Sequence, residues 1–193
     1  KFVHLKKDGH RIISYFPTFR DTGNDSFFGT QNPREVCAFL EKLSEMRAVV
    51  VCKLHYAINI FGSKAADSIP QNLDNLVILD DKMDVYPFIK LSDILITDYS
   101  SVFFDFLWLE RPIVFYPYDL DSYKRLDRGL IFDYEEMTPG PKAYRIQDLL
   151  KILCEVVDDP TSHYKYGEER RRIKEYVFDN SEGCKKITAD LVN

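Results

Sequence analysis

The sequence lacks several features that would place it in a functional class at once. No apolar run approaches the roughly 20 residues that a membrane-spanning helix needs. The net charge is −5, from 26 basic and 31 acidic residues, so bulk electrostatics do not favour nucleic acid as a partner. Neither a Walker phosphate loop nor a GxGxxG stretch occurs, which leaves the common glycine-rich nucleotide motifs out of consideration.

Paired cysteines are also missing. The four cysteines are Cys37, Cys52, Cys154 and Cys184, and none stands in a CxxC pair. Reduced thiols in a cytoplasmic protein are therefore expected. The four histidines are scattered and none pairs with a cysteine at ligand spacing, so no zinc site is predicted.

What the chain does contain is an alternation of short apolar segments with helical patterns. Its 193 residues are 45% hydrophobic, which predicts one globular domain over residues 1–193. Strands are predicted at 11–15, 48–53, 76–79, 94–96 and 113–116. Helices are predicted at 33–46, 85–90, 101–109, 146–157, 164–177 and 182–192. This order predicts an α/β fold, a Rossmann-like parallel sheet with helices on both faces.

Three stretches give no clear pattern of strands and helices. Residues 1–10 are predicted to be a frayed lead-in, and residues 116–145 a long connection with three prolines and two glycines. The weakly patterned residues 56–74 predict a loop with at most a short helix. Long connections inside a compact domain are usually functional or disordered, and the aromatic residues Tyr118, Tyr123, Phe132 and Tyr134 argue against disorder in this one.

Polar clusters follow three of the predicted strands, at 17–21, 53–55 and 98–101. Ligands of parallel sheets bind beyond the carboxyl ends of the strands, so the shared position of these clusters predicts one site. Cations from Arg20 and Lys53, the ring nitrogens of His55, and hydroxyls and helix-start amides at 100–101 suit a phosphate or pyrophosphate. Asp105, one turn into the next helix, is suited to accept hydrogen bonds from ribose hydroxyls.

Each of these residues also has a structural alternative. Arg20 is equally suited to pair with a carboxylate, Lys53 to lie at the surface, and His55 to serve structure alone. Asp105 is suited to a local bond, and the serines at 100–101 to a plain helix cap. Only the convergence of the three clusters favours a site over these alternatives.

Two further patterns are weaker. Asp119 and Asp121 form a DxD, a pattern common by chance, and we do not interpret it as a metal site. Basic runs at 170–172 and 185–186 are typical of a solvated helix face, with contact to an anionic membrane or polymer as the minority interpretation.

Several motifs in order resemble the CDP-glycerol glycerophosphotransferases, the teichoic-acid primases and polymerases and their relatives in capsule synthesis. The strongest likeness is SDILITDYSSVFFDF at 92–106, with RPIVFY at 111–116 and RGLIFDYEEM at 128–137. Upstream, YFPTFRD at 15–21 and KLH at 53–55 match in order. The resemblance covers roughly residues 11–157, which is far more specific than one short motif.

The resemblance implies the C-terminal, nucleotide-binding half of a GT-B architecture, using CDP-glycerol as donor and no metal or other cofactor. His55 would stabilise the pyrophosphate as the catalytic residue of this half. The residues implied to bind the donor are Pro17, Thr18, Arg20, Lys53, Leu54, Ser100, Ser101 and Asp105.

Two departures from the family pattern qualify this expectation. Tyr56 stands where the family has proline after the motif histidine, which frees the backbone beside His55. No histidine of this chain matches the acceptor-activating one, which belongs to the family's N-terminal domain. Since Lys1 rather than Met opens the sequence, we expect a piece of a longer enzyme that is inactive alone.

The expected reaction moves glycerol phosphate from CDP-glycerol to a membrane-linked polyol-phosphate polymer, teichoic acid or capsule, and releases CMP. The implied location is the cytoplasm, peripheral to the inner face of a bacterial membrane. Two alternatives stay open: a UDP-sugar glycosyltransferase or epimerase domain of the same architecture, and a non-catalytic interaction module. The sequence does not distinguish glycerol from ribitol phosphate.

Overall fold

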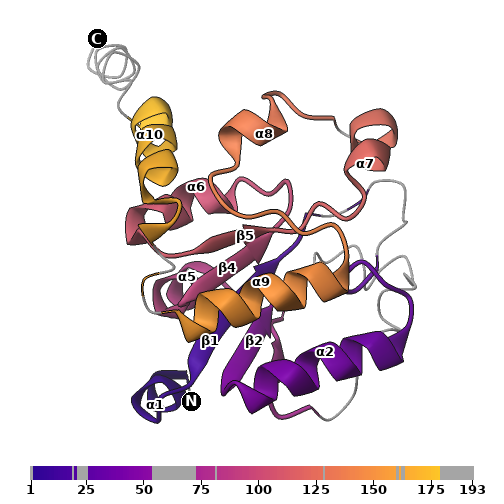
Figure 1. Ribbon diagram of the computed structural model, residues 1–193, viewed down its shortest axis with the longest axis vertical. Coiled ribbons are helices and arrows are strands. Elements are labelled where there is room, and N and C mark those ends of the chain that lie inside the picture. The colour runs from indigo at the N-terminus through magenta and orange to yellow at the C-terminus, as the bar shows by residue number, and fades with distance from the viewer. Residues whose placement is uncertain are drawn as a thin grey trace.

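Five strands form one parallel sheet in the order β3–β2–β1–β4–β5 in the computed structural model (Figure 1). The strands are β1 (Arg11–Phe16), β2 (Ala48–Cys52), β3 (Leu76–Ile78), β4 (Ile94–Thr97) and β5 (Ile113–Phe115). The structure describes residues 2–18, 20, 26–53, 73–80, 82–127, 129–159, 161 and 164–178. β1 is the central strand, since its Ile13 lies opposite Val50 of β2 and Ile94 of β4.

The strands form where the sequence is continuously apolar. Every residue of β2, β4 and β5 is buried, as are all residues of β1 after Arg11. Such runs are typical of a parallel sheet covered on both faces, because neither face is left for polar side chains. The predicted strands are confirmed, with ends that differ by one residue.

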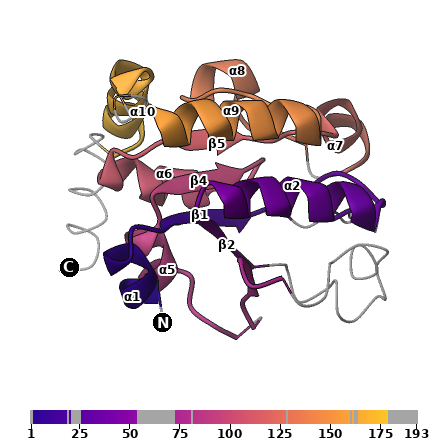
Figure 2. The same cartoon turned by 60° about the horizontal axis from the view of Figure 1, so that its bottom comes forward.

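One face of the sheet is covered by α2 (Pro33–Glu45) and α9 (Ile146–Asp158), which lie side by side in Figures 1 and 2. α2 begins as predicted: the Asn32 side chain accepts a hydrogen bond from the Arg34 amide at 3.1 Å, and Pro33 is the first helical residue. Each helix buries one apolar stripe in the core of this face, α2 against β2 and α9 against β5. These stripes consist of Val36, Phe39, Leu40 and Leu43, and of Ile146, Leu149 and Leu153.

The opposite face is covered by shorter elements. They are α1 (Phe2–Lys7), α5 (Tyr86–Leu91), α6 (Val102–Phe106), the 3₁₀ turn η1 (Leu107–Leu109), α8 (Tyr134–Met137) and α10 (Gly167–Phe178). Ile89 of α5, Phe103 of α6 and Ile173 of α10 pack into one core with Leu95 of β4. The sheet is therefore doubly wound, with helices on both faces as predicted.

Two expectations about the regular elements are wrong. Residues 2–7 form α1 rather than a frayed lead-in, because Phe2 and Leu5 pack against the core that β4 shares with α5, α6 and α10. The connection 116–145 contains two helices, α7 (Leu120–Leu126) and α8. The helix predicted at 182–192 and most of the loop predicted at 56–74 lie outside the described residues. Three predicted free thiols, Cys37, Cys52 and Cys154, are confirmed, and Cys184 lies outside the described residues.

The segment that leads into α9 runs along the outer edge of β5. The Phe115 amide donates to the Pro141 carbonyl, and the Ala143 amide to the Phe115 carbonyl, both at 2.9 Å. Gly140 allows this close approach, since a Cβ atom there would lie 2.2 Å from the Ile113 carbonyl oxygen. The edge of β5 is thus hydrogen-bonded to the chain's own backbone.

Candidate functional site

The carboxyl ends of β1 and β4 form the point at which the sheet changes its winding direction. The connection from β1 leads to α2 on one face, whereas the connection from β4 leads to α6 on the other. Adjacent strands whose connections diverge in this way leave a crevice between them, where ligands of doubly wound sheets bind. Pro17, Thr18 and Arg20 follow β1 here, and residues 98–101 follow β4. Two of the three predicted clusters therefore meet.

Arg20 lies at the centre of this region and is only 1% exposed. Its guanidinium donates to Asp98 Oδ2 at 2.8 Å, and to Asp119 Oδ2 and Oδ1 at 2.7 and 2.9 Å. It also donates to the Thr18 carbonyl. Burial alone would lower the pKa of Arg20, but the charge of Asp98 and the hydrogen bond to Asp119 raise it above the usual value. We call Arg20, Asp98 and Asp119 the arginine clasp.

Three tyrosine rings enclose the arginine clasp. The guanidinium carbon of Arg20 lies 4.9, 5.3 and 5.2 Å from the ring centroids of Tyr99, Tyr118 and Tyr123. Tyr99 stacks on Tyr123 at 3.9 Å and donates its hydroxyl to Asp119 Oδ1 at 2.9 Å. The clasp is therefore a closed, desolvated unit that joins the ends of β1 and β4 to the start of α7.

Asp98 connects further backbone segments. Its Oδ1 accepts from the amides of Thr18 at 2.8 Å and Tyr99 at 2.6 Å. Its carbonyl accepts from the Tyr134 hydroxyl at 2.9 Å, and burial raises the pKa of Tyr134. These bonds fix the backbone on either side of the crevice, so the groups that line it are positioned in advance.

The hydroxyl groups at this edge make fewer hydrogen bonds within the described residues than the charged groups do. Thr18 Oγ1 is buried and has no hydrogen-bond partner within the described part of the chain. Ser101 is exposed and precedes α6, yet its side chain makes no capping bond to the described residues. Ser100 Oγ accepts from the Val102 amide at 3.4 Å, a long and weak contact. A plain helix cap therefore does not account for Ser101.

Two further predicted residues, Lys53 and Asp105, are described by the structure. Lys53 follows β2 and donates its ammonium to the Met83 carbonyl. Asp105 is exposed on α6 and accepts from the Tyr86 hydroxyl at 3.2 Å, and the charge of Asp105 raises the pKa of Tyr86. Leu54 and His55 lie outside the described residues, so their contribution stays a prediction.

Sequence reasoning missed Asp119 and Tyr86 as members of this region. The DxD at 119–121 gave a signal for Asp119, but no pattern indicated Arg20, 99 residues away, as its partner. Arg20 adopts the alternative that the sequence left open, pairing with carboxylates. Its direct contact with a phosphate stays a prediction.

Metal-ligating residues do not gather in the part of the chain that is described: no group of three or more His, Cys, Asp or Glu side chains is placed to hold an ion there. The Asp119 carboxylate instead accepts hydrogen bonds from Arg20 and Tyr99. The groups available to a ligand at this edge are hydroxyls and backbone amides. The buried arginine clasp, in which opposite charges are paired, holds the surrounding backbone in place.

Comparison with known proteins places this geometry in context. Residues 4–189 match the family model described as CDP-Glycerol:Poly(glycerophosphate) glycerophosphotransferase. A teichoic acid poly(glycerol phosphate) polymerase of Bacillus spizizenii is 31% identical over 97% of this chain and 46% of its own length. A teichoic acid ribitol-phosphate primase of the same organism is 32% identical over 76% of this chain and 34% of its own length.

Among solved structures, the wall teichoic acid polymerase TagF superposes with a TM-score of 0.68 at 25% identity. The match covers 90% of this chain and 42% of that one. The chain thus spans less than half the length of the relatives named here. The agreement confirms the α/β, Rossmann-like fold.

Proposed function

The chain belongs to the CDP-glycerol:poly(glycerophosphate) glycerophosphotransferase family, and we propose that it supplies the donor-binding half of such an enzyme. One observation carries the proposal: Thr18 follows β1 and Ser100 and Ser101 follow the adjacent strand β4, at the switch point of a doubly wound sheet and in motifs that resemble this family's. The donor is CDP-glycerol, whose pyrophosphate lies across the carboxyl ends of β1 and β4. Its cytidine and ribose extend toward Asp105 and Tyr86 on the α5–α6 side.

In the proposed reaction, an acceptor hydroxyl attacks the β-phosphorus of CDP-glycerol. A new oxygen–phosphorus bond forms, the bridging bond to the α-phosphate breaks, and CMP leaves with the bonding electron pair. Charge grows on the bridging oxygen as it leaves, so donors that are already in place lower the barrier. We assign this task to the hydroxyls of Thr18 and Ser101 and to His55.

Arg20 has a different task in this proposal. Its guanidinium is bound to Asp98 and Asp119, so it acts as a positioning residue for the crevice rather than as a phosphate ligand. No metal or other cofactor is required, because hydroxyls, amides and His55 supply the hydrogen-bond donors. The base that takes the acceptor proton comes from outside these 193 residues, and the chain alone binds donor without turnover.

The acceptor and its location complete the proposal. We propose a membrane-linked polyol-phosphate polymer as acceptor and a peripheral position on the cytoplasmic face of the membrane. Within the described residues, none of the helices is both long and apolar enough to cross a bilayer. Relatives that carry glycerol phosphate and ribitol phosphate both match this chain, so the polyol is chosen by details of the donor pocket.

Isothermal titration of the chain with CDP-glycerol tests the donor site. Ser101→Ala and His55→Ala each remove one proposed donor to the pyrophosphate, so each weakens binding by about tenfold. Ser44→Ala changes an exposed serine in the last turn of α2, away from the crevice, and leaves the affinity unchanged. Unchanged affinity in both site variants would remove the proposed site.

The same titration separates the alternatives. Tighter binding of a UDP-sugar than of CDP-glycerol would favour a glycosyltransferase or epimerase domain, which the family match does not favour. Absence of nucleotide binding together with retained binding to liposomes would indicate a non-catalytic module. Glycerophosphate transfer by the chain alone would contradict the assignment of the acceptor base to another domain.

A further inference from the structure

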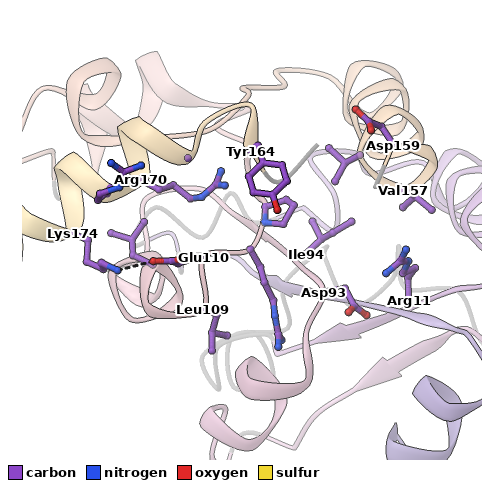
Figure 3. A pocket seen from close by; sticks show the side chains of 16 residues that line it. Arg11, Asp93, Ile94, Leu109, Glu110, Val157, Asp159, Tyr164, Arg170 and Lys174 are labelled. Atoms are coloured by element: carbon purple, nitrogen blue, oxygen red, sulfur yellow. Dashed lines mark hydrogen bonds and ion pairs between the residues drawn. The ribbon is translucent and has the colours of Figure 1, made fainter. Parts of the chain in front are cut away.

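A second cavity lies at the opposite edge of the sheet, where β1 and β4 begin. Its volume is about 590 Å³, which is within the range of small-molecule sites. Figure 3 shows Arg170 and Lys174 of α10 on one side, and Arg11 and Asp93 at the start of the sheet on the other. Neither the polar clusters nor the hydroxyls of the donor crevice line this cavity.

Basic side chains outnumber acidic ones around the cavity. Among the described lining residues, the basic ones are Arg11, Arg111, Arg170, Arg171 and Lys174, and the acidic ones are Asp93, Glu110 and Asp159. Two of the acidic groups are bound in ion pairs: Glu110 to Lys174 at 3.0 Å and Asp93 to Lys6 at 2.9 Å. Asp93 also accepts from the Ile12 amide. The field within the cavity is therefore positive.

Arg170 is the most unusual of these cations because it is only 4% exposed. The sequence predicted a solvated face for residues 170–172, and for Arg170 this is wrong. Burial lowers the pKa of Arg170, and the charges of Glu169 and Glu110 oppose that effect. Arg170 thus lines the cavity as a largely buried cation.

Arg111 is held in a fixed position at the cavity wall. Its Nη1 donates to the carbonyls of Lys90 at 2.9 Å and Ser92 at 2.6 Å. A guanidinium fixed in this way binds an oxyanion without the entropy cost of ordering a free side chain. Arg111 is thus already ordered for an oxyanion, and Arg11 and Arg171 are exposed at the same cavity.

The other walls are apolar. They include Ile94, Leu107, Pro112, Val156 and Val157. Together with the volume, these walls suit a ligand with a carbon body rather than a bare inorganic ion. Several arginines around one space favour a phosphate group, which accepts bidentate hydrogen bonds from guanidinium groups.

We propose that this cavity binds a phosphate ester, independently of the donor crevice at the other edge of the sheet. The ester group contacts arginines that line the cavity, which include Arg11, Arg111 and Arg171, and the carbon body lies against the apolar walls. Such a ligand has two sources, a free polyol phosphate or the headgroup of an anionic lipid, which share this chemistry.

NMR titration of the ¹⁵N-labelled chain with sn-glycerol 3-phosphate tests the proposal. We expect saturable shifts of arginine Nε–H signals, and about fivefold weaker binding in Arg171→Gln and in Arg11→Gln. Both arginines are exposed, so these variants fold. Arg34→Gln, on the remote helix α2, makes the same change in net charge and leaves binding unchanged.

Two further measurements decide the outcome. Ser101→Ala leaves the arginine shifts unchanged if the two sites are separate, whereas loss of binding in that variant would overturn the proposal. Co-sedimentation with phosphatidylglycerol vesicles, weakened in Arg171→Gln, without any response to free glycerol phosphate identifies the lipid headgroup as the source. If neither probe binds, or if Arg34→Gln weakens binding as much as Arg171→Gln does, the proposal is wrong.

Discussion

The two edges of the sheet differ in how far their basic side chains are balanced by acidic ones. At the carboxyl edge, Arg20 is enclosed by Asp98, Asp119 and three tyrosines, so its charge is balanced within the protein. At the amino edge, basic side chains surround a cavity in excess of the acidic ones. The difference shows that a charged residue at a strand end is not by itself a ligand contact. At the carboxyl edge the charged groups are paired within the protein, and the hydroxyls of Thr18 and Ser101 make no bond of this kind to the described residues.

The arginine clasp gives the largest expected effect. Arg20→Met leaves the Asp98 carboxylate buried without its cation, which lowers the free energy of unfolding by about 3–5 kcal/mol. Urea denaturation measures the change. The control, Arg145→Met, breaks an ion pair with Asp148 that is largely exposed, so no measurable loss is expected there. Equal losses in the two variants would show that the clasp does not hold the edge together.

The dependence of the unfolding free energy on alkaline pH tests whether the tyrosines around the clasp are enclosed. Burial raises the pKa of Tyr118 to about 12, from about 10 when unfolded. Above about pH 10 the unfolded chain loses this proton first, so the stability contribution is complete below about pH 10 and falls up to about pH 12. The expected slope is about 1.4 kcal/mol per pH unit for this residue.

Tyr118→Phe removes that part of the slope, as measured by urea denaturation at about pH 9.5 and about pH 11.5. Tyr176→Phe is the control, since Tyr176 on α10 is 61% exposed, and it leaves the slope unchanged. Removing the hydroxyl can also change the unfolding free energy by an amount that does not depend on pH. The change of the unfolding free energy with pH isolates the contribution of the ionisation. A slope in Tyr118→Phe that equals that of the unmodified chain would contradict the closed environment of the clasp.

Two threonines at the same edge distinguish a structural hydroxyl from one kept for a ligand. Thr97 Oγ1 donates to the Phe16 carbonyl at 2.9 Å in a buried position, so Thr97→Val costs about 1–3 kcal/mol. Thr18 Oγ1 makes no such bond to the described residues, so Thr18→Val leaves the unfolding free energy unchanged or raises it.

Donor affinity is expected to respond in the opposite sense. Thr18→Val weakens CDP-glycerol binding by about tenfold in calorimetric titration, because the ligand loses one hydrogen bond in a dry site. If Thr18→Val destabilises the fold as much as Thr97→Val does and leaves donor affinity intact, the Thr18 hydroxyl serves structure alone.

Chelation gives the smallest expected effect. The Asp119 carboxylate is bound to Arg20 and Tyr99, so the DxD does not present it to a metal ion. Donor affinity is therefore expected to be equal in EDTA and in magnesium or manganese. A clear loss of affinity in EDTA that magnesium restores would show that a cation takes part in donor binding.

The sequence predicted the sheet well because its strands are continuous apolar runs, whose pattern depends only on neighbours in the chain. It missed α1, whose six residues become a helix by packing Phe2 and Leu5 on the core. It also missed α7 and α8, which are seven and four residues long and too short for a helical period to stand out.

The sequence predicted where the candidate site lies, but it did not predict the partners and roles of the individual residues. The clusters after β1 and β4 could be placed at one edge, since parallel strands end together. The partner of Arg20 could not be predicted, because Asp119 is 99 residues away and the pairing depends on how β5 and α7 follow the sheet. Tyr86 was missed for the same reason: its contact with Asp105 joins two helices across a strand.

The chain segment beside β5 has a consequence for behaviour at high concentration. An exposed edge strand offers unpaired backbone groups to a second molecule and so promotes aggregation. Here Pro141 and Ala143 occupy the backbone groups of Phe115, and Gly140 makes their approach possible. Any side chain at position 140 would push the segment that contains Pro141 and Ala143 away from β5. The backbone of Phe115 would then be open to pairing with a second molecule, so this glycine also acts against aggregation.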